Sequence, residues 1–588
     1  MNAKMKKTLG SLALGLALSS CASAAFAGIL KSPYLIYPGQ NSQMTVLWQD
    51  NASEVGNTLT WGTDPTFTTN LGSTPVAEYG SANQHRYTIT SLSPDTTYYY
   101  KVEATAGGTL YGSGSFITGP ADNATSVRFL GMGDSRSQPF ALDNVMKAMK
   151  QFYSIPGNAD YQRLVIHNGD WVSTDGESYW TSQWFDPTKT DIVSFTSSSP
   201  INGCKGNHDN SGSYPNGTST YFTKYFPFPY QYSTHNSVVT PFDPATVQTW
   251  GNLYWSFDYG PVHVTVVDNY SNLAPGSAQY NWVQSDLAGT TKQWKILIYH
   301  EPAYSAGSDA ENVNVRNLES LITQYGVDLI YCGHSHNYAR AGAYSTAQAG
   351  GDTIALNVPH ITSGGGGAPT YQPDMTNAGS YSHVITAWPA FEFMTFNVSG
   401  KTLTMTAYQV NNVSTTAIQP MSANFPTTDG GSTLSLTPIE TVVLNHFTNV
   451  TPQVGVKTSN IVYNRATQLY TGNLTITNNG PDLTGNVHVV LDGLLDLNQI
   501  GAADNQYSTA TPKLTSKIAA NPGNAKGITT AFLNPNVKLT NATSSQNGEP
   551  MIRATANGLA NGASVTVPVT FSNPTNKPIN FNPIVYQE

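Results

Sequence analysis

The alternation of apolar and polar residues divides the chain into three regions. From Gly28 to about Pro120, turn residues separate short segments such as QMTVLWQD and TTYYYKVEAT, within which apolar and polar residues alternate. This pattern is typical of half-buried β-strands. From residue 125 to 412, continuous apolar runs alternate with segments of helical periodicity. After about Phe447 the strict alternation returns, as in GNVHVVLDGL and SVTVPVTFSNP. This pattern predicts a mixed α/β domain flanked by two all-β domains.

The region 125–412 has the pattern of sheets covered by helices. The runs VRFLGMGD, RLVIHNGD, VHVTVVD, KILIYHEP and VDLIYCGH predict strands that are buried on both faces. ALDNVMKAMKQFY and NVRNLESLITQYG predict helices, and Gly326 is expected to end the second of them. The stretch around 415–442 is rich in Thr, Ser and Gly and predicts a linker. A second β-sandwich is expected over residues 443–588.

The first 27 residues have the features of a bacterial export signal. Three lysines precede an apolar stretch, and Ala25-Phe26-Ala27 follows it, so we expect cleavage after Ala27. The apolar stretch is too short for a stable membrane span, and no other run is long enough. The letters LSSC also fit a lipoprotein signal with a lipid anchor at Cys21. A secreted or periplasmic protein is therefore expected, with an outer-membrane lipoprotein as the alternative.

Length and charge narrow the classes of function. With 588 residues, the chain is too long for one hydrophobic core. The formal net charge is -9, and no basic stripe is present to meet a nucleic acid backbone. Nucleic acid is therefore excluded as the main partner, whereas a small phosphorylated substrate held by a metal is compatible with this charge.

Residue types that bind metals follow several predicted strands or loops of the region 125–412. In open α/β sheets, sites form where the carboxyl ends of strands converge, so these residues are expected to meet. Two carboxylates, one amide and three imidazoles are enough for two first-row metal ions that share a bridging carboxylate. The candidate ligands are Asp134, Asp170, Asn207, His300, His334 and His336, and His208 and Asp209 follow Asn207 directly.

The ordered series GD, GD, GNHD, H and GHxH resembles the calcineurin-like metallophosphoesterases. The resemblance is strongest to the purple acid phosphatase branch, as HEPAYSAGS, YGVDLIYCGHSHNYAR and ITSGGGGAPTY show. That branch also carries a fibronectin type III-like domain in front, which residues 28–120 resemble. The resemblance implies a four-layer αββα core over residues 125–412, a dinuclear metal site, and Fe, Zn or Mn as the metals.

Carried over to this chain, the resemblance implies two ligand sets that share Asp170. The first metal would take Asp134, Asp170 and His336, and the second Asp170, Asn207, His300 and His334. His208 would steady a phosphoryl oxygen or protonate the leaving group, with Asp209 as its candidate orienting partner.

The sequence departs from the family pattern at two positions. Purple acid phosphatases have a metal-binding Tyr where this chain has Ser173, so we expect no coloured tyrosinate–iron complex. Other branches have a His where this chain has Arg136. Arg136 is either a clamp for phosphoryl oxygens or the partner of an ordinary salt bridge.

Three further features leave alternatives open. Cys204 and Cys332 either form a disulfide or remain buried thiols. The run Gly364–Gly367 lacks the Lys and Ser/Thr of a nucleotide loop, so a tight turn near the site is expected. In the loop DWVSTDGESYW, the aromatic residues Trp171, Tyr179 and Trp180 either form a rim that grips the leaving group or anchor the loop.

These features together favour an exported phosphomonoesterase. A phosphodiesterase of the same family is the first alternative. The second is a surface binding or adhesion protein with a degenerate centre, in which the flanking domains do the work. The C-terminal domain contains no cluster of ionisable residues, so it is expected to stabilise the protein or attach it to a surface or partner.

Overall fold

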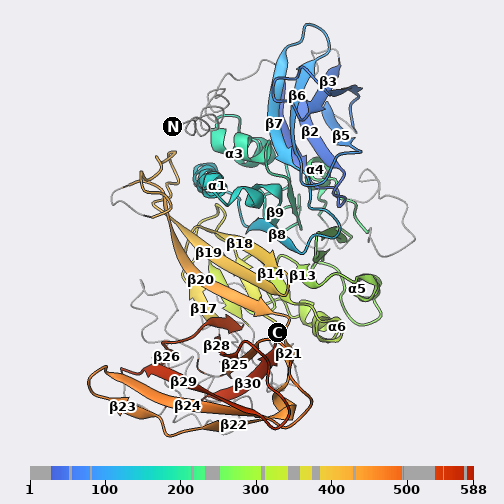
Figure 1. Ribbon diagram of the computed structural model, residues 1–588. Coiled ribbons are helices and arrows are strands. Elements are labelled where there is room, and N and C mark those ends of the chain that lie inside the picture. Colours follow the sequence, from blue (N-terminus) through green and yellow to red (C-terminus); the bar gives the residue numbers. More distant parts are fainter. Residues whose placement is uncertain are drawn as a thin grey trace, which may run out of the picture.

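The computed structural model describes residues 28–588 with some internal stretches left out. These stretches are 52–55, 80–81, 213–216, 232–251, 306–310, 342–357, 374–383, 428–431, 493, 495–536, 547–548, 575–578 and 580. The predicted export signal and Cys21 lie outside the described residues. Figure 1 shows the N-terminal strands at the top, the mixed α/β region in the middle and the C-terminal strands at the bottom.

The N-terminal region consists of two antiparallel sheets around one core. One sheet has the order β1 (Ile29–Ile36), β2 (Met44–Asp50), β5 (Gln84–Ile89). The other has the order β4 (Gly72–Val76), β3 (Asn57–Gly62), β6 (Thr97–Ala104), β7 (Leu110–Ile117). Buried side chains of both sheets, among them Trp48 and Tyr100, form this core.

Two larger sheets make up the middle of the molecule. The first has the order β10 (Ile201–Gly203), β9 (Val165–His167), β8 (Ser126–Met132), β18 (Glu392–Ser399), β19 (Thr402–Asn411), β20 (Ser435–Asn445). The second has the order β11 (Trp255–Tyr259), β12 (Val262–Val266), β13 (Trp294–Ile298), β14 (Leu329–Cys332), β16 (His360–Ser363), β15 (Tyr338–Ala341), β17 (Val384–Trp388). Strands β8, β9 and β10 are parallel, as are β12, β13, β14 and β16.

The two central sheets share a core, and helices pack against each of them. Tyr331 of β14 meets Phe396 of β18 edge to face, with ring centroids 5.5 Å apart. Helix α1 (Pro139–Ser154) packs its Phe152 against Phe393 of β18. Helices α5 (Ala278–Gly289) and α6 (Glu319–Tyr325) pack against the other face of the second sheet, in a separate cluster that includes Leu297.

Strand β13 shows why these strands contain continuous apolar runs, here Ile296–Ile298. Ile296 and Ile298 belong to the core between the sheets, whereas Leu297 faces α5 and α6. Successive side chains of a strand point to opposite faces, so a strand covered on both faces has apolar residues at every position. The predicted end of the second helix is confirmed: α6 ends at Gly326, whose φ is 62°.

The predicted linker at 415–442 needs correction. Strand β20 pairs with β19 along its whole length, so residues 435–445 belong to the first central sheet. Leu436, Val442 and Leu444 of β20 are buried in the core that contains both sheets. The abundance of Thr and Ser concealed this strand, in which the exposed Thr437, Pro438 and Thr441 separate the buried Leu436 from Val442 and Leu444.

The C-terminal region has two further antiparallel sheets. One has the order β21 (Thr448–Asn449), β30 (Asn582–Gln587), β25 (Val487–Asp492), β28 (Glu549–Thr555), β27 (Ser544–Gln546). The other contains β22 (Val454–Thr458), β24 (Leu469–Asn478), β29 (Ser564–Ser572) and β26 (Lys538–Leu539), with β23 (Val462–Asn464) paired to β24. Both contribute to one core. No helix among the described residues combines the length and apolar character needed to cross a membrane.

Candidate metal centre

The candidate ligands lie just past the carboxyl ends of strands in both central sheets. Asp134 follows β8, Asp170 follows β9 and Asn207 follows β10 in the first sheet, while His300 follows β13 and the pair His334 and His336 follows β14 in the second. Since the two sheets share a core, these ends converge, and the structure brings all six side chains into one site.

The backbone at this site adopts an uncommon conformation. Asp134, Asp170 and His334 have φ values of 51°, 57° and 70°, in the left-handed region that side chains other than Gly rarely adopt. Such residues cost free energy and tend to cluster at functional sites. The turns lift these side chains off the strand ends and direct their polar atoms toward one another.

Glycines allow the loops of the site to approach one another. A Cβ at Gly206 would lie 2.1 Å from Oδ1 of Asp170, and a Cβ at Gly333 would lie 2.4 Å from Oδ2 of Asp134. Real Cβ atoms do not come this close to an oxygen, so a side chain at either position would displace a carboxylate of the site.

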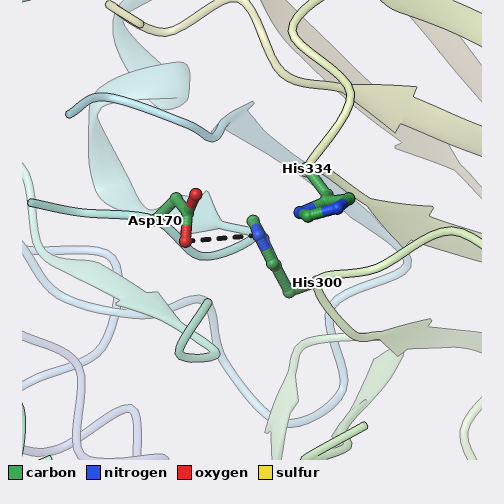
Figure 2. Close-up of side chains that lie close together, drawn as sticks. All are labelled: Asp170, His300 and His334. Atoms are coloured by element: carbon green, nitrogen blue, oxygen red, sulfur yellow. Dashed lines mark ion pairs between the residues drawn. The ribbon is translucent and has the colours of Figure 1, made fainter. Parts of the chain in front are cut away.

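Four donor atoms surround one point in what we call the Asn207 group: Asp170, Asn207, His300 and His334. Nε2 of His300 lies 3.3 Å from Oδ1 of Asp170 and 3.1 Å from Oδ1 of Asn207. Nδ1 of His334 lies 3.1 Å from the same Asn207 oxygen. Figure 2 shows the Asp170 carboxylate and the rings of His300 and His334 around this point, with the ion pair between Asp170 and His300 dashed.

The Asn207 group fits a first-row metal ion. Donor atoms that each lie about 2.0–2.2 Å from a metal are about 3.0–3.5 Å from one another, which matches the separations above. A carboxylate, an amide oxygen and two imidazoles form a mixed O and N donor set, which favours Fe, Zn or Mn over Ca or Mg.

Hydrogen bonds around His300 fix the direction of its donor atom. Nδ1 of His300 donates to the carbonyl oxygen of Asn168, so Nε2 faces the other ligands. Although burial opposes charge there, Asp170 raises the pKa of His300 to about 10. Burial likewise opposes charge on Asp170, yet His300, His208 and Arg136 hold the pKa of that carboxyl well below its usual range. Without a metal, the Asn207 group therefore holds a proton where the metal would bind.

The remaining candidate ligands form what we call the Arg136 group: Asp134, Asp170 and His336, together with Arg136. Donor atoms of the first three lie within 4.8 Å of one another. Nε of Arg136 donates to Oδ2 of Asp170 at 3.0 Å, and its Nη2 lies 3.2 Å from Nε2 of His336. As the side chains stand, Arg136 engages two of the three donors, so the Arg136 group does not fit a metal ion.

Burial sets the protonation states within the Arg136 group. Burial, with the adjacent Arg136 cation, lowers the pKa of His336 to about 3, so this imidazole is neutral. Burial, opposed by His300 and reinforced by Asp170, raises the pKa of Asp134 to about 8. Oδ2 of Asp134 accepts a hydrogen bond from the backbone N–H of His334 at 2.9 Å.

The structure places His208 beside Asp170 and separates it from its expected partner. The backbone N–H of His208 donates to Oδ1 of Asp170 at 2.9 Å, and its Nδ1 donates to the carbonyl oxygen of Ser173 at 2.8 Å. Asp209 instead accepts hydrogen bonds from the backbone N–H groups of Trp171, Val172 and Gly206. The Ser173 carbonyl thus orients His208, because both Asp209 oxygens are directed at loop amides.

The two cysteines, the aromatic loop and the glycine run near the site have defined environments in the structure. Cys204 and Cys332 are both free and buried, so they act as small apolar residues. Trp171 and Trp180 are fully buried and anchor their loop, while Tyr179 is 41% exposed. In the predicted turn, the N–H of Gly366 donates to the carbonyl oxygen of Gly133, next to Asp134.

Two supporting residues were not singled out from the sequence. Nδ2 of Asn168 donates to the carbonyl oxygens of Cys332 and Ser363, and so ties the loop after β9 to β14 and β16. Oδ1 of Asn269 accepts the backbone N–H of His300 at 3.0 Å. The sequence signal was that Asn168 directly follows β9 and Asn269 lies three residues past the end of β12, at strand ends where an amide can bond to neighbouring loops.

The site is open on one side. Asp134, Asp170, His300 and His336 are buried, whereas Arg136, Asn207, His208 and His334 are only partly buried. A ligand from solvent would therefore meet Arg136, His208 and the outer atoms of the Asn207 group first.

Comparison with known proteins agrees with this geometry. The family model for the calcineurin-like phosphoesterases matches residues 127–338, and the model for the purple acid phosphatase N-terminal domain matches residues 31–118. Purple acid phosphatase 18 of Arabidopsis thaliana is 25% identical over 344 residues, which cover 56% of this chain and 69% of the relative. Purple acid phosphatase 15 of the same plant is 24% identical over 286 residues, or 45% of this chain and 51% of the relative, so the match spans about half of that protein.

A solved structure shows the same fold. Purple acid phosphatase PPD1 from yellow lupin (Lupinus luteus) seeds superposes with a TM-score of 0.51 at 19% sequence identity, covering 64% of this chain and 71% of that one. The expected multidomain architecture with a mixed α/β core is thereby confirmed.

Proposed function

The chain carries a calcineurin-like phosphoesterase domain behind a purple acid phosphatase N-terminal domain, and from this premise we propose that it is an exported, metal-dependent phosphomonoesterase. The observation that carries the proposal is the Asn207 group, in which Nε2 of His300, from the second sheet, lies 3.1 Å from Oδ1 of Asn207 and 3.3 Å from Oδ1 of Asp170, both from the first sheet. We further propose that the central sheets and their helices form the four-layer αββα core, and that residues 28–120 form a fibronectin type III-like domain.

The Asn207 group would hold the metal, with Fe, Zn or Mn as the candidates. A metal bound there supplies Lewis-acid polarisation of a phosphoryl oxygen and lowers the pKa of a coordinated water. Asp170 contributes a carboxylate whose charge is fixed by its neighbours, and Nε2 of His300 points inward because Nδ1 is bonded to Asn168.

His208 is proposed to handle the proton of the leaving group. Because Nδ1 donates to the Ser173 carbonyl, Nε2 is the ring atom available to the substrate. His208 is partly buried and lies against Asp170, so it stands at the open side of the site. Asp209 acts by holding the loop that carries Asn207 and His208 through three backbone amides.

Arg136 is proposed to clamp the phosphoryl group. Among the described residues, its hydrogen bonds use three of the five N–H groups of the guanidinium, which leaves one on each terminal nitrogen. Two parallel N–H groups match two oxygens of a phosphate. A monoester dianion has three terminal oxygens for a metal and this fork, whereas a diester has two, which favours the monoester.

The remaining expectations are part of the same proposal. We propose export through the predicted signal at residues 1–27, with a lipid anchor at Cys21 as the alternative. The C-terminal sheets are proposed to stabilise the protein or attach it to a surface or partner.

The test is a phosphate-release assay on the purified full chain. The protein is stripped with a chelator, reloaded with Zn, Mn or Fe, and assayed on nitrophenyl phosphate and its bis-ester side by side. We expect metal-dependent hydrolysis of the monoester, with the bis-ester slower by at least about tenfold. A preference for the bis-ester would favour the phosphodiesterase instead. No hydrolysis of either ester by the reloaded protein would favour the surface binding protein.

The variant Asp170→Asn completes this test, because it keeps the size of the side chain while it removes the charge. It should abolish turnover with an unchanged circular dichroism spectrum. Asp122→Asn, at an exposed carboxylate of the segment before β8, is the matched control and should have the activity of the unaltered chain.

A further inference from the structure

The guanidinium of Arg136 lies among the donor atoms of the Arg136 group. Nε donates to Oδ2 of Asp170 at 3.0 Å, and Nη2 approaches Nε2 of His336 at 3.2 Å. The side chain of Arg136 is 16% exposed, and that of Asp170 is 1% exposed. A fixed positive charge therefore already sits in a buried place where one carboxylate and one imidazole converge.

A metal ion and Arg136 need the same lone pair of His336. Nδ1 of His336 donates its hydrogen to the carbonyl oxygen of Pro369 at 2.7 Å. With its hydrogen on Nδ1, the ring has a single lone pair at Nε2, in the ring plane, and this lone pair accepts from Nη2 of Arg136. The ring is held in this orientation by Tyr371, which stacks on it at a centroid distance of 4.2 Å. His336 can therefore bind either Arg136 or a metal ion through Nε2, but not both.

A network of hydrogen bonds holds the guanidinium of Arg136 in this place. Nη1 donates to Oγ of Ser137 at 3.3 Å, and Oγ of Ser137 is hydrogen-bonded to Oγ of Ser173 at 2.8 Å. Oε1 of Gln183 accepts the backbone N–H groups of Ser137 and Ser173 at 3.0 and 2.9 Å. The two positions at which the sequence departs from the family pattern, Arg136 and Ser173, are therefore joined through Ser137.

What remains of the donor set is too small for a metal. Oδ2 of Asp134 accepts the N–H of His334, and among the described residues its Oδ1 accepts no hydrogen bond. With Asp170 and His336 engaged by Arg136, Asp134 is the one ligand of the set that remains, and one carboxylate is fewer than the three or four protein ligands that a first-row ion takes.

We infer that the Arg136 guanidinium takes the place of one of the two metal ions, so that the centre consists of one metal in the Asn207 group and one arginine. Members of this family use a dinuclear centre, and this chain keeps the positive charge of the first position but supplies it from a side chain. The inference rests on the proposed function only for the metal in the Asn207 group. Arg136 then both neutralises Asp170 and presents its two remaining N–H groups to the substrate.

The test counts metal ions rather than turnover. The unaltered chain, Arg136→His and Arg136→Ala are stripped, reloaded with Mn(II) in excess, desalted and measured by elemental analysis and electron paramagnetic resonance. Arg86→His, in the N-terminal region where Arg86 stacks on Tyr79, is the matched control. The unaltered chain and the control should hold about one equivalent with the spectrum of an isolated ion.

The two Arg136 variants should gain metal. Arg136→Ala frees Oδ2 of Asp170 and Nε2 of His336, and Arg136→His adds an imidazole as well, so both should approach about two equivalents with a spin-coupled spectrum. The inference is overturned if the unaltered chain already holds about two coupled ions, or if both variants remain at about one. If the unaltered chain binds no metal, the proposed function itself fails, which is a separate result.

Discussion

The Asn207 group and the Arg136 group share Asp170 but use it differently. Oδ1 of Asp170 faces His300 at 3.3 Å, whereas Oδ2 accepts Nε of Arg136 at 3.0 Å. In the Asn207 group, an amide oxygen and two imidazoles turn their donor atoms to a common point. In the Arg136 group, a guanidinium already stands between the donors. One carboxylate can therefore bind a metal on one side and a side-chain cation on the other. Arg136, two positions after Asp134, makes the two groups different.

The largest expected effect comes from removing a donor of the Asn207 group. His300→Ala should lower kcat/KM by about 10³-fold or more, about 4 kcal/mol, because the metal loses a ligand and the Lewis acid with it. Elemental analysis and phosphate release measure the two losses together. His446→Ala, whose ring stacks on Trp294 away from the site, is the control. Retention of full activity by His300→Ala would remove the Asn207 group from the mechanism.

A smaller loss is expected when the shared carboxylate is pushed aside. A Cβ in Gly206→Ala would meet Oδ1 of Asp170 at 2.1 Å, so the carboxylate must move and both groups are disturbed. We expect activity to fall by about 10²-fold with weaker metal binding. Gly176→Ala is the control, because its Cβ meets its nearest neighbour, Tyr179, at an ordinary 3.4 Å. Equal activities of the two variants would show that the position of Asp170 is not critical.

His336→Ala separates the two groups most clearly. Since His336 bonds to Arg136 rather than to a metal, its loss should leave the metal content unchanged and lower kcat/KM only about tenfold, through a less fixed Arg136. Metal analysis and steady-state kinetics are the readouts. Loss of metal in this variant, to the extent seen in His300→Ala, would show that His336 is a ligand after all.

Metal binding by the Asn207 group should release a proton. In the metal-free protein, Asp170 raises the pKa of His300 to about 10, so His300 is protonated at neutral pH and must lose its proton to a metal. Metal affinity should therefore rise with pH, by about tenfold per unit, until the pH passes about 10. Calorimetry in buffers of different ionisation enthalpy counts the protons, and a heat that is the same in all buffers would contradict the assignment.

The smallest expected effect concerns the visible absorption spectrum of the iron-loaded protein. With Ser173 where purple acid phosphatases have a Tyr ligand, the iron-loaded protein should have no strong visible charge-transfer band. Oγ of Ser173 is hydrogen-bonded to Ser137 and Gln183, and Ser137 in turn accepts a hydrogen bond from Arg136. An absorption spectrum of the iron-loaded chain decides the matter, and a strong band would mean that another phenolate binds the metal.

Local patterns in the sequence were sufficient to predict four of the strands that carry the site, β8, β9, β13 and β14, but not the short β10 that precedes Asn207. The runs Ile296–Ile298 of β13 and Leu329–Cys332 of β14 are apolar at every position because both faces of the sheet are covered, and that signal is visible without coordinates. Strand β20 was missed, because Thr, Pro and Glu interrupt its apolar residues and the residues before it are mainly Thr, Ser and Gly. Pairing with β19, which no local pattern reveals, makes it part of the central sheet.

The candidate ligands could be chosen from their order along the chain, but their division into two groups could not. The contacts of Arg136 with Asp170 and His336 join positions 34 and 200 residues apart. The same is true of Asp209, whose partners are backbone amides rather than His208. The sequence also did not reveal the left-handed conformation of Asp134 and Asp170, whose φ values are 51° and 57°.

The most direct test of the account is to titrate metal into the stripped, full-length chain while phosphate release from nitrophenyl phosphate is followed. The account predicts no turnover in the stripped protein and a rise in rate in proportion to the metal bound by the Asn207 group, with no such rise in His300→Ala. Undiminished hydrolysis by a preparation in which elemental analysis detects no metal would contradict it.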